Sequence, residues 1–379
     1  MTGSLLRRCR ATLGPGVTRL GAAAAAVGLA ALVAGVTFGL GTVSLGTLAA
    51  SWLFFAGLAA ATVAFSAAVR CSRAHWVDVV SPAAEAGAAF FPFALALLAV
   101  LLVLAGLWMP AAAGVGRVVW AERLVRDLIA SALLFGAGRR YLRRARIGDG
   151  SGATPAAVIY LVLYAAVLSL WAIDLVMSLH EWAPSTVIPP YYFMGAFLAA
   201  IATVALAESV GREGPASPTT RQDLGKLLFA MVVMWGYLLW SAYLPVWYGN
   251  MPDETGQLLA RWQGGWKVIT LAMLAAVLVF PFFFLLPERT KRGRKTLEAA
   301  SLSVLAGLFG EQFLLVLPSL PVHLDAPSIL VGACVTIGVA GLFVLAAGSA
   351  FQPRGGAWPG APAPSWERSS GDRDGGSAA

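Results

Sequence analysis

The sequence predicts an all-α integral membrane protein of about ten transmembrane helices, and two observations support this prediction. Hydrophobic residues make up 59% of the 379 residues and charged residues only 12%, whereas soluble domains typically carry about 25% charged residues. The apolar residues also come in blocks of about 18 or more, which short basic or Gly/Pro-containing connectors separate. A chain with this composition lacks the polar surface that a soluble fold needs.

Ten segments are predicted to span the membrane, because each approaches the length that a helix rising 1.5 Å per residue needs to cross a hydrocarbon core about 30 Å thick. The fourth is the weakest, since it is short and carries Arg126 and Asp127 near its start. The spans are Thr18–Leu40, Thr47–Val69, Ala84–Trp108, Arg123–Tyr141, Ala156–Leu179, Val187–Val210, Leu224–Trp247, Gly265–Leu286, Ala299–Leu317 and Ser328–Gly348.

The spans divide the chain into an N-terminal segment (residues 1–17), a transmembrane domain (18–350) and a C-terminal tail (351–379). The tail is rich in Gly, Pro, Ser and charge, so we expect it to be disordered. The first span follows three arginines, as a signal peptide does. Its apolar stretch is longer than the usual 7–15 residues or so of such a peptide, so we expect a retained helix.

The distribution of basic residues predicts that both termini are cytoplasmic. With that orientation, all but five of the 27 Lys and Arg residues fall in the inner segments, and positive charge favours the cytoplasmic side. The expected location is the bacterial inner membrane. The net charge of +8 is then explained by anionic lipid headgroups rather than by nucleic acid. The five exceptions are Arg117, Arg123, Arg126, Arg261 and Lys267.

The sequence contains few residues that could hold a metal or a redox cofactor. Its three cysteines are far apart, and its three histidines fall in connectors or at span ends. A transmembrane haem needs axial ligands inside the helix bundle, and structural zinc and iron–sulfur sites need clustered Cys or His. We therefore expect this chain to carry no cofactor itself, with a quinol or quinone as its possible ligand.

Polar residues inside the spans are the candidate functional groups, because ionisable side chains in a membrane are costly. In the fifth span, Tyr160, Tyr164, Trp171, Asp174 and Ser178 recur at helical spacing and so share one face. At 1.5 Å per residue, Asp174 lies roughly 8 Å below the outer end of that span.

Two other spans carry polar residues at a similar depth. Tyr237, Ser241 and Tyr248 share a face of the seventh span, and Glu311 lies in the ninth. This shared depth predicts either a quinol pocket or proton path that opens to the outer side, or a hydrogen-bonded cluster that orients the helices. Both interpretations stay open for the carboxylates, whereas the structural one is favoured for the tyrosines and Ser241.

Charged residues at the span ends complete the set of candidates. His180 and Glu181 lie at the outer rim, where they extend a proton route or are simply solvated. Asp223 and Lys226 are three residues apart at the start of the seventh span. This spacing predicts an ion pair, with Asp223 also complementing the helix dipole, and a structural role is favoured over a catalytic one.

Several motifs resemble those of one membrane family. The first motif is Asp174-Leu-Val-Met177-Ser178-Leu179, followed by Ser185-Thr186 and Tyr191-Tyr192-Phe193-Met194-Gly195-Ala196-Phe197. The second is Asp223-Leu-Gly-Lys226-Leu-Leu-Phe, followed by Trp247-Tyr248-Gly249-Asn250-Met251-Pro252-Asp253-Glu254-Thr255. The third is Phe280-Pro281-Phe282-Phe283. They resemble the NrfD-like subunits of alternative complex III. The chain is most similar to the ActF type, quinone-binding subunit 2 of quinol:cytochrome c oxidoreductase, with the paralogous ActC type close behind.

This resemblance implies two four-helix bundles plus two flanking helices. It also implies a complex with multihaem cytochrome c, iron–sulfur and paralogous NrfD-like subunits, which oxidises quinol and passes electrons to cytochrome c or an oxidase. The chain departs from the family pattern after Leu179 and at Ala242, where the family often has Gln, and it has Leu308 where the family often has His. The alternatives are a secondary transporter, a purely structural anchor of redox subunits, and the membrane anchor of a molybdopterin oxidoreductase.

Overall fold

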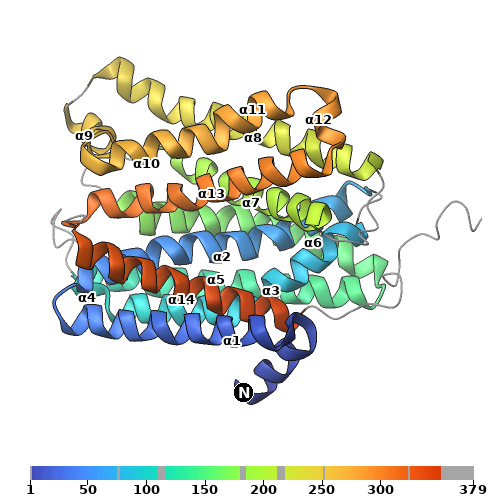
Figure 1. Ribbon diagram of the computed structural model, residues 1–379, viewed down its shortest axis with the longest axis horizontal. Helices are drawn as coiled ribbons and strands as arrows, with labels where there is room; N and C mark the ends of the chain where they lie inside the picture. The colour runs from blue at the N-terminus through green and yellow to red at the C-terminus, as the bar shows by residue number, and fades with distance from the viewer. Residues whose placement is uncertain are drawn as a thin grey trace, which may run out of the picture.

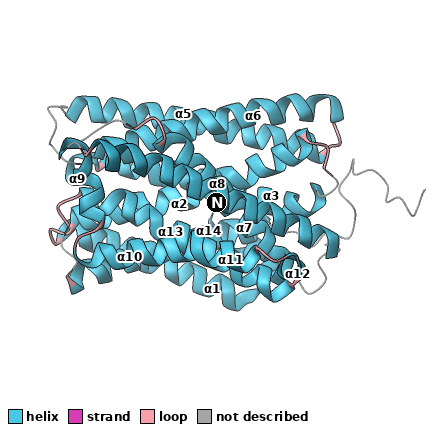
Figure 2. Ribbon diagram, turned by 90° about the horizontal axis from the view of Figure 1, so that it is seen from above, coloured by secondary structure: helices cyan, strands magenta, loops and turns pink. Residues whose placement is uncertain are grey.

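The computed structural model describes residues 2–74, 77–109, 117–179, 185–210, 218–250, 252–322 and 325–350, and all regular structure in these ranges is helical. The elements are α1 (Thr2–Thr37), α2 (Gly41–Cys71), α3 (Val77–Val103), α4 (Ala105–Trp108), α5 (Arg117–Arg146), α6 (Gly150–Trp171), η1 (Ala172–Val176), η2 (Met177–Leu179), α7 (Ile188–Val210), α8 (Pro218–Gly249), α9 (Pro252–Arg261), α10 (Gly264–Leu274), η3 (Ala275–Val279), α11 (Phe280–Leu285), α12 (Glu288–Arg292), α13 (Arg294–Val316), η4 (Leu317–Ser319) and α14 (Ala326–Ala350). The long helices lie side by side (Figures 1 and 2).

Nine helical segments within these ranges are long and apolar enough to cross a membrane. They coincide with nine of the ten predicted spans to within a few residues. The exception is α5, which covers the predicted fourth span but carries too many charged residues for the same criterion. It nevertheless contacts α3 and α6, and it runs in the same direction as the other long helices (Figure 2). The predicted all-α membrane fold of about ten helices is confirmed.

The bundle can be divided into two groups of four helices and a flanking pair, although contacts also cross between them, from α2 to α7 and α13 and from α3 to α14. Helices α2, α3, α5 and α6 contact one another, and α7, α8, α10–α11 and α13 form the second group. Helices α1 and α14 pack against each other along their length and against α2. The start of α1 and the end of α14 lie at the same end of the bundle (Figure 1).

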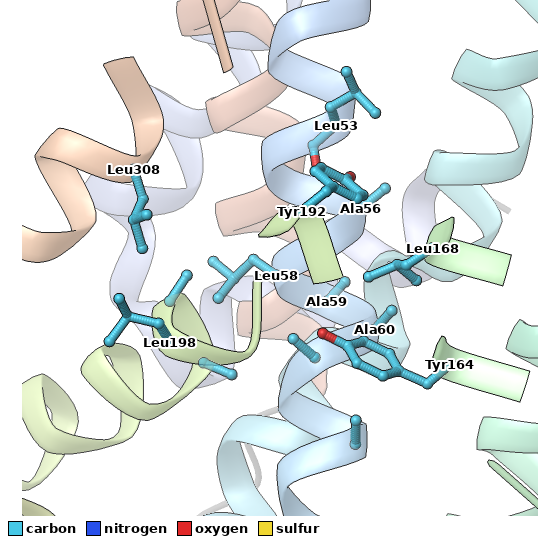
Figure 3. Close-up of a cluster of buried hydrophobic side chains, with 14 of the residues drawn as sticks. Leu53, Ala56, Leu58, Ala59, Ala60, Tyr164, Leu168, Tyr192, Leu198 and Leu308 are labelled. Carbon is cyan, nitrogen blue, oxygen red and sulfur yellow. The ribbon is translucent and has the colours of Figure 1, made fainter. Parts of the chain in front are cut away.

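Helix α2 is the centre of the molecule, because it contacts both groups and the flanking pair. Most of its residues are buried, many of them Ala, Gly and Ser, and small residues let neighbouring membrane helices approach closely. Tyrosines from other helices donate to its backbone: Tyr192 to the Leu53 carbonyl at 2.8 Å and Tyr160 to the Ala60 carbonyl at 2.9 Å. Tyr164 and Tyr192 lie beside α2 in Figure 3.

The flanking pair is held by glycines at its crossing. A Cβ atom added to Gly28 of α1 would lie 2.4 Å from the Gly338 Cα of α14, so the two backbones touch. This close approach gives extensive van der Waals contact, which drives helix association where lipid weakens the hydrophobic effect.

Two terminal and connecting segments add detail to the predicted organisation. Helix α1 extends into residues 1–17 and is interrupted at Gly14, whose positive φ of 81° suits only glycine, just before Pro15. The connector between the seventh and eighth spans contains the short helix α9. The predicted disordered tail, residues 351–379, lies outside the described residues.

Candidate functional site

Asp174 lies in an irregular turn near one end of the first four-helix group. Residues Ala172–Val176 form a π-helix that follows α6, and a 3₁₀ turn continues it. The Ser178 hydroxyl donates to the Ile173 carbonyl at 2.9 Å, which satisfies a backbone acceptor at this break in the helix. Single π turns are frequent at functional sites, and here the turn directs the Asp174 side chain, only 1% exposed, into the protein.

Helix α5 supplies partners for Asp174 and Ser178. Arg126 forms an ion pair with the Asp174 carboxylate, and Arg123 donates to the Ser178 hydroxyl at 2.7 Å. The Arg126 side chain is 53% exposed, so its guanidinium bridges a buried carboxylate and the surface of the bundle. The arginines near the start of α5 are thus explained by their contacts with Asp174 and Ser178.

Asp127 adds a second buried carboxyl group to the same place. Its side chain is completely buried, and neither carboxyl oxygen has a hydrogen-bond partner among the described residues. Its charged neighbours are Asp174 and Arg126. The Ser131 hydroxyl donates to the Asp127 backbone carbonyl at 2.6 Å and accepts from the Trp171 indole at 3.0 Å, which ties α5 to α6 beside the carboxyl groups.

The acidic site, defined as Arg126, Asp127 and Asp174, adjoins an open groove of about 640 Å³. Its lining comes mainly from α5 and is almost entirely apolar, with two charged residues. The groove is open to the surface of the bundle, and the Arg126 guanidinium reaches from it to the Asp174 carboxylate. The lining includes Glu122, Val125, Arg126, Ile129, Leu133 and, from α6, Leu170.

Glu311 forms a separate polar site in the second four-helix group. Its side chain is 4% exposed and accepts a hydrogen bond from the Tyr191 hydroxyl. The Trp235 ring lies beside Tyr191 with ring centroids 5.7 Å apart, and its indole nitrogen has no partner among the described residues. No Lys or Arg within the described ranges forms an ion pair with Glu311.

The two carboxylates therefore belong to different surroundings, although the elements that hold them are neighbours. The turn η1 contacts α7 and α13, which carry Tyr191 and Glu311. Asp174 is bound by one cation, Arg126, beside an open groove, whereas Glu311 lies among aromatic side chains. The sequence predicts a similar depth for Asp174 and Glu311. In the structure, each of these residues lies in a site of its own, on a different group of helices.

The other predicted candidates take up different places. Tyr237 and Tyr248 of α8 are 64% and 85% exposed, and the Ser241 hydroxyl donates to the Tyr237 carbonyl of its own helix at 2.8 Å. They join neither carboxylate. Residues His180 and Glu181 lie outside the described residues.

Two structural predictions are visible in the contacts. The Lys226 amine lies 3.6 Å from the Asp223 carboxylate, as the three-residue spacing predicts. The Tyr160 and Tyr164 hydroxyls bond to backbone carbonyls, Tyr164 to that of Phe193 at 2.6 Å. These tyrosines tie helices together, which favours the structural interpretation.

Comparison of the chain with models of known protein families and with curated proteins finds no match. The resemblance to NrfD-like subunits therefore stays a prediction from motifs. Among the described residues, no three His, Cys, Asp or Glu side chains come together as a metal site, and this leaves the question of cofactors as the sequence left it.

Sequence reasoning missed three residues of these sites: Arg126, Asp127 and Tyr191. A signal for the first two was present, since an adjacent Arg–Asp pair near the start of an otherwise apolar span is expensive unless it meets a partner. Tyr191 carried no such signal, because nothing in the sequence separates it from Tyr160, Tyr164 and Tyr192, whose hydroxyls bond to backbone carbonyls.

Proposed function

We propose that this chain is a membrane subunit of a quinol-oxidising electron-transfer complex, in which the acidic site accepts protons from a quinol bound in the adjoining groove. Oxidation of a quinol to a quinone releases two electrons and two protons. The electrons would pass to a cofactor of a partner subunit, a multihaem cytochrome c or an iron–sulfur protein. The protons would pass to acidic groups of this chain near the outer face of the inner membrane.

One observation carries the proposal: two buried carboxyl groups and one guanidinium lie beside an open, apolar groove on the outer face of α5. A quinol has an apolar tail and a polar ring, so it reaches such a groove from the lipid without passing through water. The apolar lining suits the tail, and Arg126 provides a hydrogen-bond donor for a ring oxygen.

The arrangement of charges suits proton acceptance. One guanidinium balances one carboxylate, so the Asp127–Asp174 pair has room for one exchangeable proton. The unpartnered oxygens of Asp127 are free to accept or pass on that proton. Glu311 and its hydrogen-bond donor Tyr191 are a second pair of polar groups that extends the same proton path.

The test is to purify the complex from native membranes and measure quinol oxidation for Asp174→Asn. We expect the partner subunits to co-purify and turnover to fall roughly 100-fold or more, as for loss of a general base. Asp127→Asn should also slow turnover. The matched control is Asp223→Asn, which removes an exposed carboxylate of α8 and should leave turnover unchanged.

Two results would overturn the proposal. Normal turnover of an assembled Asp174→Asn complex would make that carboxylate purely structural. A chain that purifies without haem, iron–sulfur subunits or quinol activity would favour the transporter alternative.

A further inference from the structure

The exposed face of α5 includes Val125, Ile129 and Leu133, which also line the groove beside the acidic site, and it continues past them to Gly136 and a group of arginines. Val125, Ile129, Leu133 and Gly136 recur at helical spacing and point away from the bundle. A Cβ atom at Gly136 would meet nothing within 4 Å, so this part of the face is open. The apolar stripe extends about 16 Å along the helix axis, which is close to half of a hydrocarbon core about 30 Å thick.

Three arginines continue the stripe at the end of α5. Arg139, Arg140 and Arg143 are exposed, and none has an ion-pair or hydrogen-bond partner among the described residues. Arg140 and Arg143 fall on the same side of the helix as Gly136, four and seven residues further on. The stripe therefore ends in a cationic cluster.

Three other basic residues, Arg144, Arg146 and Lys291, have partners within the protein. Arg146 lies 3.1 Å from the Glu85 carboxylate, and Arg144 donates to the Gly152 carbonyl at 3.2 Å. Lys291 lies over the Phe229 ring at 4.7 Å. The three arginines of the stripe differ, since their charge faces outward.

We propose that this face of α5 binds an anionic phospholipid, with the phosphate held by Arg139, Arg140 and Arg143. One acyl chain lies along the apolar stripe from Gly136 to Val125. The charge of the cluster is opposite to that of a lipid phosphate, and the stripe matches the length of one leaflet. Basic clusters at the cytoplasmic ends of membrane helices attract anionic headgroups. Because Val125, Ile129 and Leu133 also line the groove proposed for the quinol, a bound phospholipid and a quinol compete for this face. Lipid binding itself can be measured without quinol oxidation.

The experiment titrates the purified full-length chain in detergent with phosphatidylglycerol or phosphatidylcholine and counts bound lipids by native mass spectrometry. We expect phosphatidylglycerol to bind more tightly, and Arg140→Gln/Arg143→Gln to weaken it roughly tenfold or more. The control pair, Arg19→Gln/Lys295→Gln, removes two exposed charges from α1 and α13 and should leave binding unchanged. Thermal unfolding checks that both variants fold.

A second measurement tests whether the whole lipid or only its phosphate group is recognised. Inorganic phosphate at millimolar concentration should not displace phosphatidylglycerol, because it lacks the acyl chain that contacts the stripe. Three results would overturn the proposal: equal affinity for the two lipids, equal losses in the two variant pairs, or release of a co-purifying protein rather than a lipid by Arg140→Gln/Arg143→Gln. The last would assign the arginines to an acidic protein partner.

Discussion

The two buried acidic sites show two ways of placing a carboxylate inside a membrane protein. Asp174 is bound by Arg126 in a π turn at the edge of the first helix group, beside an open groove. Glu311 lies within the second group and accepts from Tyr191, with no ion pair to a described cation. A counter-charge that reaches the surface suits exchange with a ligand, whereas an enclosed polar contact suits storage or relay of a proton.

The largest expected effect comes from removing the shared cation. Arg126→Met leaves Asp127 and Asp174 buried without their neutralising partner, so the free energy of unfolding should fall by about 2–4 kcal/mol. Reversible unfolding in mixed micelles measures this change in the free energy of unfolding. The double variant Arg126→Met/Asp174→Asn should regain part of the loss, and a strictly additive result would mean that the two residues do not interact.

Neutralising each carboxylate in turn sharpens the comparison. Asp174→Asn should destabilise the chain by about 1–3 kcal/mol because it removes a charge-assisted bond. Glu311→Gln should change stability by less than about 1 kcal/mol, since Gln keeps the volume and still accepts from Tyr191. The same unfolding assay compares them, and equal losses would show that Glu311 has a cationic partner outside the described residues.

An effect smaller than that of Asp174→Asn is expected at the donor to Glu311. Tyr191→Phe removes the hydroxyl and should cost about 1–2 kcal/mol, the range for a buried hydrogen bond to a polar group. Tyr192→Phe, which removes the bond to the Leu53 carbonyl, is the matched control from the adjacent position. If Glu311 depends on its tyrosine, Glu311→Gln and Tyr191→Phe should be non-additive, while Glu311→Gln and Tyr192→Phe should add.

The smallest effects belong to the exposed face of α8. Tyr237→Phe and Ser241→Ala should each change stability by less than about 0.5 kcal/mol, because neither side chain contacts another helix through its hydroxyl in the described contacts. Quinol oxidation by the complex should also be unchanged. A large loss of turnover would place this face in contact with a partner subunit or a ligand.

The positions of the spans were predictable because each span is a long block of apolar residues in the sequence. The Asp223–Lys226 pair also followed from its spacing, as local contacts within one helix do. Asp174 and Glu311 were recognisable as candidates, since an ionisable residue within an apolar span needs a partner. Their partners were harder to predict, because Arg126 and Tyr191 come from helices whose rotation about their axes the sequence leaves open.

The sequence by itself determined that this chain forms a bundle of about ten membrane helices. A long apolar segment in lipid must satisfy its own backbone hydrogen bonds, and a helix does so. It also determined where the costly polar residues lie along each helix. Only the tertiary structure decided which of them meet. It turned Asp174 toward α5, enclosed Glu311 beside Tyr191 and left Tyr237 and Tyr248 facing outward. The reason is that helix rotation and neighbour choice depend on close packing between surfaces far apart in the chain.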